Sequence, residues 1–479
     1  MKAFWLKMPV FAVVILVLII LVTVFSPSKP QPVETQQTGP EPQEAGDTDL
    51  RPESKAEKRE AELHAEEKPN PKVDYMAKVN ELYKAGRDEV LNAAPFYQKA
   101  IELCVKGSEE QRTLATRSWP TELSVDQQKL LKQWVESNSE ALSQLELGTK
   151  KPYYWLEYSS PDGNMTGVLM PGLSEIRQLM FALRDRAKLS AAKGNIDKAL
   201  ADIITCYRFG LHMSDSLTLI EQLVGMACRS LAIQISFVIL DQTSIGKASL
   251  EALQSKIEKF STDESYIVDL RVERLFQLDI IQRVFTDDGQ GDGRIHMESA
   301  MSILSAMNIQ KTTEQMQSFQ ELRRRQTIQT FEDLSGYFGA LVKKNPGQWK
   351  NENINPQKEI EEITADNPLV QICCPSVVRV AKIFARCKAE TGALITTLAL
   401  MRYKADKGRL PEKLDELVSA GYLKALPNDS FSDRPFVYKR LGEDFTLYSF
   451  GEDCDDDAGT RSEWGKGEQG GDQVFWPVQ

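Results

Sequence analysis

A long uncharged apolar segment near the start of the sequence constrains the fold more than any other feature. From Met8 to Phe25 the residues read MPVFAVVILVLIILVTVF and carry no charge. This is about the 20 residues that an α-helix needs to cross a bilayer. Lys2 and Lys7 precede the segment and a Glu-rich stretch lies after it, so the positive-inside rule predicts a cytoplasmic N-terminus. We therefore expect residues 1–26 to be a transmembrane signal anchor. The protein would be a single-pass inner (cytoplasmic) membrane protein with its body in the periplasm or another extracytoplasmic space.

A cleaved signal peptide is the alternative interpretation of the same segment. Against it, the apolar run is longer than the core of a typical signal peptide, and no A-x-A cleavage site lies after it. No cysteine near its end could accept a lipid. The length favours an uncleaved anchor.

Residues 27–72 have the composition of a disordered tether. They are rich in Pro, Gln, Glu and Lys and nearly free of large apolar side chains. Such a segment cannot bury enough surface to offset the entropy lost on ordering. We expect it to connect the membrane helix to a folded body.

Overall composition limits the classes of function. The formal net charge of −11 argues against nucleic acid as a partner, because phosphate binding needs a basic face. The seven cysteines form no CxxC pair, which excludes the usual zinc ribbon and thioredoxin motifs. Most are expected to be small buried hydrophobes.

Residues 73–388 show the apolar spacing of a helical domain. Helices are predicted from 74 to about 83, after Pro95, over 125–147, from 173 to about 187 and from 196 onward, with a break at 193–195. Residues 217–240 are apolar nearly all round and are expected to form a central buried helix. The helix–turn–helix at the break and FYQKAIEL at 96–103 resemble a degenerate tetratricopeptide repeat. No clean 34-residue period supports a tetratricopeptide repeat. An ordinary helical hairpin is therefore an equally good interpretation.

Residues 389–479 read as a small α+β module, which makes the fold class mainly α with a mixed C-terminus. A helix is predicted to end at Lys407–Gly408, with a second short helix over 412–423. Alternating strands are predicted at 436–439 and 445–450, joined by a hairpin, and a last strand at 473–476.

The order of these pieces resembles the periplasmic domain of the type II secretion major pseudopilin. The likeness rests on the stretch from YKADKGRLPEKLDELVSAGYL to FTLYSFGEDCDDDAG and covers about 90 residues. In that family an Asp-rich terminal loop binds calcium, which implies Asp453 and Asp472 as ligands here. The leader, cleavage site and Glu of a pseudopilin helix are missing around residues 8–25, so assembly into a pilus is not implied. The whole layout is also similar to that of bacterial membrane-anchored helical proteins, a likeness that implies no particular function.

Calcium is the one ligand that the sequence supports, mainly through this resemblance. A hard cation prefers six to eight oxygen ligands, and the glycines of the terminal loop allow carbonyls to turn inward. The carboxylates expected to take part are those of Asp453, Asp455, Asp456, Asp457 and Asp472. A solvated acidic tail is the alternative.

A second acidic loop lies at residues 287–295. Counted from Asp288, it has Asp, Gly and Ile at positions 5, 6 and 8 of an EF-hand loop. Gln290 stands at position 3, however, and Ser299 stands at position 12, where a bidentate Glu belongs. A Gly-rich turn between helices is the favoured reading.

No catalytic motif stands out. The sequence has three histidines and neither HExxH nor GxSxG. We expect His212 to pack in the body and Arg323–Arg325 to form a solvated face. The favoured function is a non-enzymatic interaction or scaffold protein whose protein partners the sequence does not identify. One alternative is a secretion- or pilus-associated component that docks through a free strand edge of the module. Another is an envelope hydrolase with two opposed carboxyls near the aromatic residues 153–158.

Overall fold

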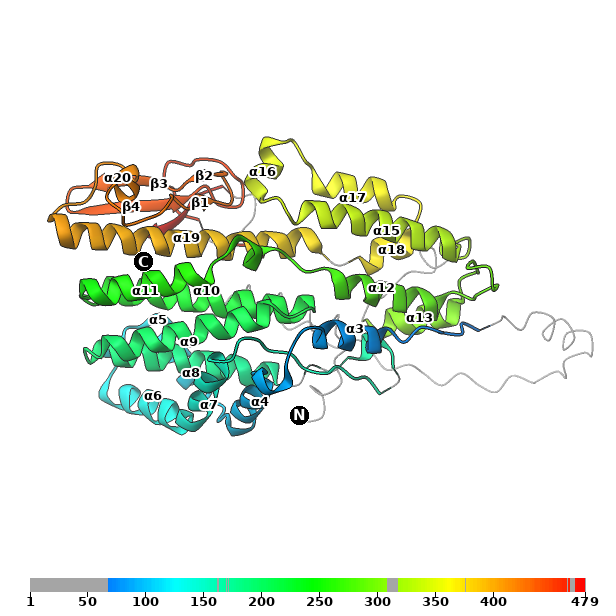
Figure 1. Cartoon of the computed structure of the whole chain (residues 1–479), viewed down its shortest axis with the longest axis horizontal. Helices are drawn as coiled ribbons and strands as arrows, with labels where there is room; N and C mark the ends of the chain where they lie inside the picture. Colours follow the sequence, from blue (N-terminus) through cyan, green and yellow to red (C-terminus); the bar gives the residue numbers. More distant parts are fainter. Residues whose placement is uncertain are drawn as a thin grey trace, which may run out of the picture.

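The computed structural model describes residues 68–161, 163–168, 170, 172–307, 318–374, 376–462, 464–465 and 470–478. The predicted membrane helix at 1–26 and most of the predicted tether lie outside these residues. The described chain is mainly helical, as expected. Figure 1 shows its long helices running side by side, with the strands gathered at one end.

The helical part begins with a set of short elements and continues into longer ones. The first group comprises α3 (Tyr75–Lys84), η2 (Glu89–Leu91), α4 (Ala94–Leu103), α5 (Glu109–Arg117), η3 (Pro120–Glu122), α6 (Val125–Ser137), α7 (Ser139–Thr149) and η4 (Met165–Gly167). The second comprises α8 (Leu173–Ala192), α9 (Ile196–Ser214), α10 (Leu219–Gln242), α11 (Lys247–Phe260), η5 (Asp263–Tyr266), α12 (Arg271–Val284) and α13 (Met297–Ala306). The last comprises α15 (Arg324–Leu341), α16 (Pro346–Asn351), α17 (Pro356–Thr364), α18 (Pro368–Cys373), α19 (Val377–Lys407) and α20 (Asp415–Ser419).

Helix α10 is the buried central helix that the apolar sequence predicts. It packs against α8, α9 and α19, and most of its side chains are buried. Two described stretches, Leu219–Gln242 and Pro368–Lys407, are long and apolar enough to span a membrane by composition alone. In α10 the apolar surface is covered by the protein itself, which is what a core helix requires. The predicted break between α8 and α9 is also present, and Gly194 takes the left-handed conformation there (φ 79°).

The helix predicted over 125–147 is instead two helices, α6 and α7, that meet at Asn138. The buried Asn138 carboxamide donates to the carbonyls of Val105 and Trp134 at 3.0 and 3.1 Å and accepts from Val105 N at 3.0 Å. These bonds hold the junction against a segment distant in sequence. The apolar spacing alone could not reveal this partner.

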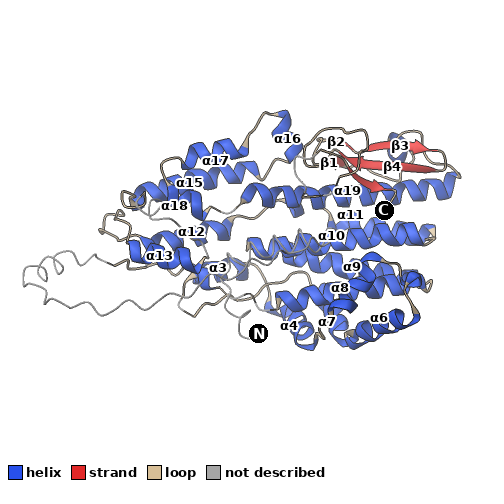
Figure 2. Cartoon of the chain, turned by 180° about the vertical axis from the view of Figure 1, so that it is seen from behind, coloured by secondary structure: helices blue, strands red, loops and turns tan. Residues whose placement is uncertain are grey.

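Helix α19 begins at Val377, earlier than the start expected at 389. The expected boundary between the two domains, at 388/389, therefore falls inside this helix. One side of α19 packs on α10 and α11, and another contacts the strands of the C-terminal module. Figure 2 shows these strands lying along α19.

The predicted strands of the module are present. The strands are β1 (Asn428–Asp429), β2 (Arg434–Pro435), β3 (Val437–Leu441), β4 (Asp444–Ser449) and β5 (Gln473–Trp476). The first two form a short antiparallel pair, and the others form an antiparallel sheet in the order β3-β4-β5. β3 and β5 are therefore the edge strands of the larger sheet. A register shift lies between Leu447 and Tyr448.

Candidate functional site

The acidic loop between β4 and β5 brings some of the predicted carboxylates together. Oδ2 of Asp453 and Oδ2 of Asp457 accept from the same amide, Gly471 N, at 3.1 and 2.7 Å. Asp472 is the next residue, and its Oδ2 accepts from Gly459 N at 2.6 Å. Three of the five predicted ligands thus lie around residues 470–472.

The other two predicted ligands point elsewhere. Asp455 Oδ1 lies 2.6 Å from Nζ of Lys350 on α16. Asp456 Oδ1 accepts from the hydroxyl of Tyr448 and from Ala458 N, both at 3.0 Å. As the described side chains stand, no group of three acidic, histidine or cysteine side chains is placed to hold a metal. A bound cation would therefore require the loop to tighten.

Asp472 is the residue whose surroundings favour binding of a positive charge. Its side chain is fully buried (0% exposed), and Oδ1 has no hydrogen-bond partner among the described residues. The pKa of Asp472 is raised to about 6, chiefly by burial and also by the nearby carboxylates of Asp456 and Asp457, while the amide of Gly459 opposes the shift. A buried carboxylate oxygen without a partner is costly. A hard cation held by oxygens of Asp453, Asp457 and Asp472 fits this donor set.

The second acidic loop forms the interhelical turn that was favoured for it. It joins α12 to α13, and Phe285 bridges Ile295 across its base. Asp288 Oδ1 accepts from Gln290 N at 2.8 Å and from Asp292 N at 3.0 Å, so this carboxylate shapes the turn.

The basic run at 323–325 is largely solvated, as expected, because Arg323 and Arg325 are exposed, but it also contacts the second acidic loop. Arg324 pairs with Asp287 at 3.1 Å, and the guanidinium of Arg325 donates to the carbonyl of Gln290 at 2.7 Å. These arginines attach the start of α15 to the acidic loop. The sequence shows both charged runs but not that they meet, because some thirty residues separate them.

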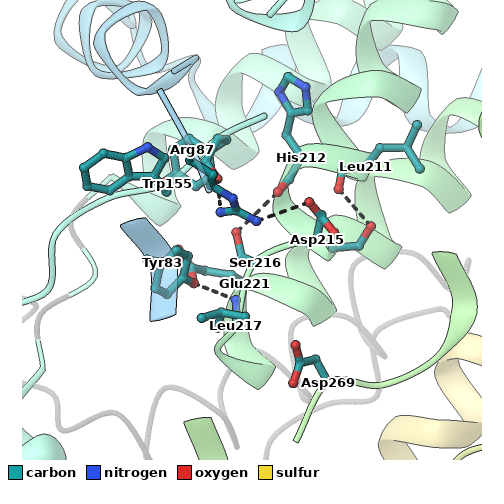
Figure 3. Close-up of polar contacts among 12 residues, drawn as sticks. Tyr83, Arg87, Trp155, Leu211, His212, Asp215, Ser216, Leu217, Glu221 and Asp269 are labelled. Atoms are coloured by element: carbon teal, nitrogen blue, oxygen red, sulfur yellow. Dashed lines mark hydrogen bonds and ion pairs between the residues drawn. The ribbon is translucent and has the colours of Figure 1, made fainter. Parts of the chain in front are cut away.

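A buried carboxylate beneath the aromatic loop is a feature that the sequence reading missed. Glu221, in the first turn of α10, accepts through Oε2 from the hydroxyls of Tyr83 (2.8 Å) and Thr218 (2.7 Å), and also from Tyr158. Burial raises the pKa of Glu221, and the three hydroxyl donors oppose that shift. Figure 3 shows Tyr83 lying beside Glu221 and Leu217, whose amide donates to the tyrosine hydroxyl at 2.6 Å.

The polar contacts near Glu221 join separate elements of the fold. Asp215, one of two further carboxylates labelled in Figure 3, accepts from Arg87 at 3.4 Å. Arg87 also donates to the carbonyl of Tyr154 at 3.2 Å. The contacts join α3 and the aromatic loop to the α9–α10 connection. The sequence signal was Glu221 itself, a charge in the first turn of a mostly apolar helix.

His212 packs in the body as predicted. Its Nδ1 lies 2.6 Å from the hydroxyl of Tyr97. The pKa of His212 is lowered to about 4, chiefly by burial and also by the positive charge of Arg208.

Comparison with known proteins gives no family for the chain. No protein-family model matches it, no curated protein matches it, and no solved structure matches it. The resemblance of the C-terminal module to a pseudopilin domain therefore stays a prediction.

Proposed function

We propose that the chain is a membrane-anchored extracytoplasmic scaffold that binds other proteins and that carries a calcium-stabilised C-terminal module. The anchor and the location rest on the uncharged segment at 8–25 and on the lysines before it. The scaffold role is supported by the way the body uses the buried Glu221 and the half-buried Arg87. Glu221 and Arg87 bind neighbouring elements of the same chain and hold a helical surface in place.

The observation that carries the calcium proposal is the buried Asp472 oxygen. It lies beside Asp456 and Asp457, and it has no hydrogen-bond partner among the described residues. Calcium would be held by Asp453, Asp457 and Asp472, with carbonyl oxygens of the loop completing the shell. The ion would neutralise the repulsion among these carboxylates and so stabilise the folded module.

Thermal unfolding of the full chain in detergent tests this proposal. An ion that binds only the folded form stabilises it by RT ln(1 + [Ca²⁺]/Kd), about 2.7 kcal/mol at a hundredfold excess over Kd. The melting temperature should therefore be higher in calcium than in a chelator, and magnesium should substitute poorly because it prefers a smaller octahedral shell.

Paired variants localise the effect. Asp453→Ala with Asp472→Ala should abolish the calcium-dependent shift. Glu361→Ala with Glu362→Ala, which removes two exposed carboxylates from α17, should keep it. Coincident melting curves of the unmodified chain in calcium and in chelator would leave the loop as a solvated acidic segment.

A second candidate function is docking to a secretion or pilus fibre. The observation in its favour is the position of β3 at the edge of its sheet, where it has a neighbour, β4, on one side only. An edge strand can accept a strand from another protein, although Lys439 and Arg440 are residues of the kind that discourage unspecific pairing. A crosslink in native cells from Leu441, which is 59% exposed, to a fibre subunit would favour this function.

A further inference from the structure

A lysine from the helical body is bound to the acidic loop of the C-terminal module. Nζ of Lys350 donates to Oδ1 of Asp455 at 2.6 Å and to the carbonyl of Cys454 at 2.9 Å, and it lies 3.5 Å from the carbonyl of Asp453. Three oxygens of consecutive loop residues thus surround one ammonium group. Lys350 supplies part of the positive charge that this loop needs.

The helix that carries Lys350 contacts the module at further points. Gly347 N donates to the carbonyl of Ser430 at 3.0 Å, and the amide of Asn345 donates to Oδ1 of Asp433 at 3.0 Å. A side chain at position 347 would collide with the backbone of Asp433, at 2.8 Å from its nitrogen, so the two backbones lie in close contact. Helix α16 therefore joins the helical body to the module, and Lys350 is the charged contact of that junction.

The oxygens that Lys350 holds are of the kind that a calcium ion would need. Asp453, Asp457 and Asp472, bound through one oxygen each, would fill only part of a shell of roughly six to eight oxygens. The loop offers further oxygens at residues 453–455, and these are the ones that the ammonium group occupies. A divalent ion and an ammonium group on the same short loop also repel each other.

We propose that Lys350 is an internal counter-ion of the acidic loop and that calcium displaces it. Calcium binding then weakens the contact between α16 and the module and changes how firmly the module is attached to the body. This inference rests on the proposed calcium function. The linkage is reciprocal, since any factor by which calcium weakens the Lys350 contact is the factor by which that contact weakens calcium binding.

Calcium titration of full-length Lys350→Met tests the competition. The variant keeps the apolar stem and removes the charge, and the side chain at this position is 45% exposed, so folding should tolerate it. Its calcium Kd should be at least about fivefold lower than that of the unmodified chain, the lower end of typical coupling between sites. Lys344→Met is the matched control. Lys344 pairs with Glu352, and its removal should leave the Kd unchanged.

Hydrogen exchange provides a second readout that needs no variant. In the unmodified chain, calcium should increase amide exchange over residues 346–351, and in Lys350→Met it should have no such effect. An equal or higher Kd in Lys350→Met, or slower exchange over 346–351 in calcium, would overturn the competition while leaving the calcium function in place. If neither the unmodified chain nor Lys350→Met nor Lys344→Met binds calcium, the calcium function itself is overturned, and this inference with it.

Discussion

At the scale of single residues, polar side chains fix contacts between segments that are distant in sequence. Asn138 binds Val105, Glu221 binds Tyr83, and Lys350 binds the loop at 453–455. Asn138 and Glu221 are buried, and their bonds matter because an unpaired buried polar group would cost about 1–3 kcal/mol. His212 obeys the same rule through Tyr97, and its neutral state makes it sensitive to pH.

The buried His212 predicts a loss of stability in mild acid. Burial lowers its pKa to about 4, from an ordinary value of about 6.5 in the unfolded chain. Between these values the unfolded chain binds a proton that the folded chain does not, so the free energy of unfolding falls as the pH falls from about 6.5 toward 4. The contribution of this residue should be about 2 kcal/mol between pH 7 and pH 5.

Chemical denaturation at several pH values measures this contribution. The free energy of unfolding of the unmodified chain and of His212→Gln should be compared at pH 7 and at pH 5. The variant should lose less stability than the unmodified chain over that interval. Equal losses would mean that His212 is protonated freely in the folded protein.

The candidate site was predictable in its residue types and only partly in its geometry. The Asp-rich loop could be recognised because four of its carboxylates lie within residues 453–457, whereas Asp472 was implied by the resemblance. Which of them face one another depends on the path of the backbone, where Cys454 and Ala458 take positive φ and the chain returns at Gly471. The contact between Asp455 and Lys350 could not be predicted from any local pattern, because about a hundred residues separate the two.

At the scale of secondary structure elements, apolar spacing located the elements better than their ends. The central helix α10, the break at Gly194 and the hairpin β3–β4 all follow from local patterns. The junction at Asn138 and the early start of α19 do not, because tertiary contacts determine them. Within the body, the closest pairing is that of α9 with α10, and two glycines make it possible.

Gly225 should be intolerant of any side chain. A Cβ atom there would lie 2.3 Å from Ser214 N and 2.5 Å from the carbonyl of Gly210, and these are backbone atoms of α9. The helices would have to separate, so Gly225→Ala should lower the free energy of unfolding by about 1–3 kcal/mol or more.

Gly336, inside α15, is the matched control for this prediction. A Cβ atom at that position meets nothing within 4 Å. Because alanine is a better helix former than glycine, Gly336→Ala should stabilise the protein by up to about 1 kcal/mol. Equal effects of the two substitutions, measured by thermal unfolding, would show that α9 and α10 are not in backbone contact.

At the scale of the whole molecule, the module and the body share one long helix. α19 contacts α10 and α11 of the body and the strands of the module, and Arg386 of α19 pairs with Glu452 beside the acidic loop. The side-chain amide of Gln254 in α11 also donates to the carbonyl of Tyr422 at 2.8 Å. The module is thus attached to the body at several points, and a change in the acidic loop can reach α16 and α19.

The start of the folded body predicts where a protease should cut the anchored protein. Asp74 caps α3 by accepting from Ala77 N at 2.9 Å, and Gln282 binds the backbone of Val73 at 3.1 and 2.8 Å. The chain is held from this point onward, whereas the composition of residues 27–72 predicts a disordered segment that proteases cut first. Trypsin cuts after Lys or Arg unless Pro follows, so trypsin added outside spheroplasts should release a soluble fragment that begins between residue 56 and residue 73. N-terminal sequencing of that fragment identifies the cut.

Untreated protein should remain in the membrane and begin near Met1. A body that is soluble without trypsin and begins near Ser26 would show a cleaved signal peptide. A body that trypsin cannot reach from outside would place it in the cytoplasm.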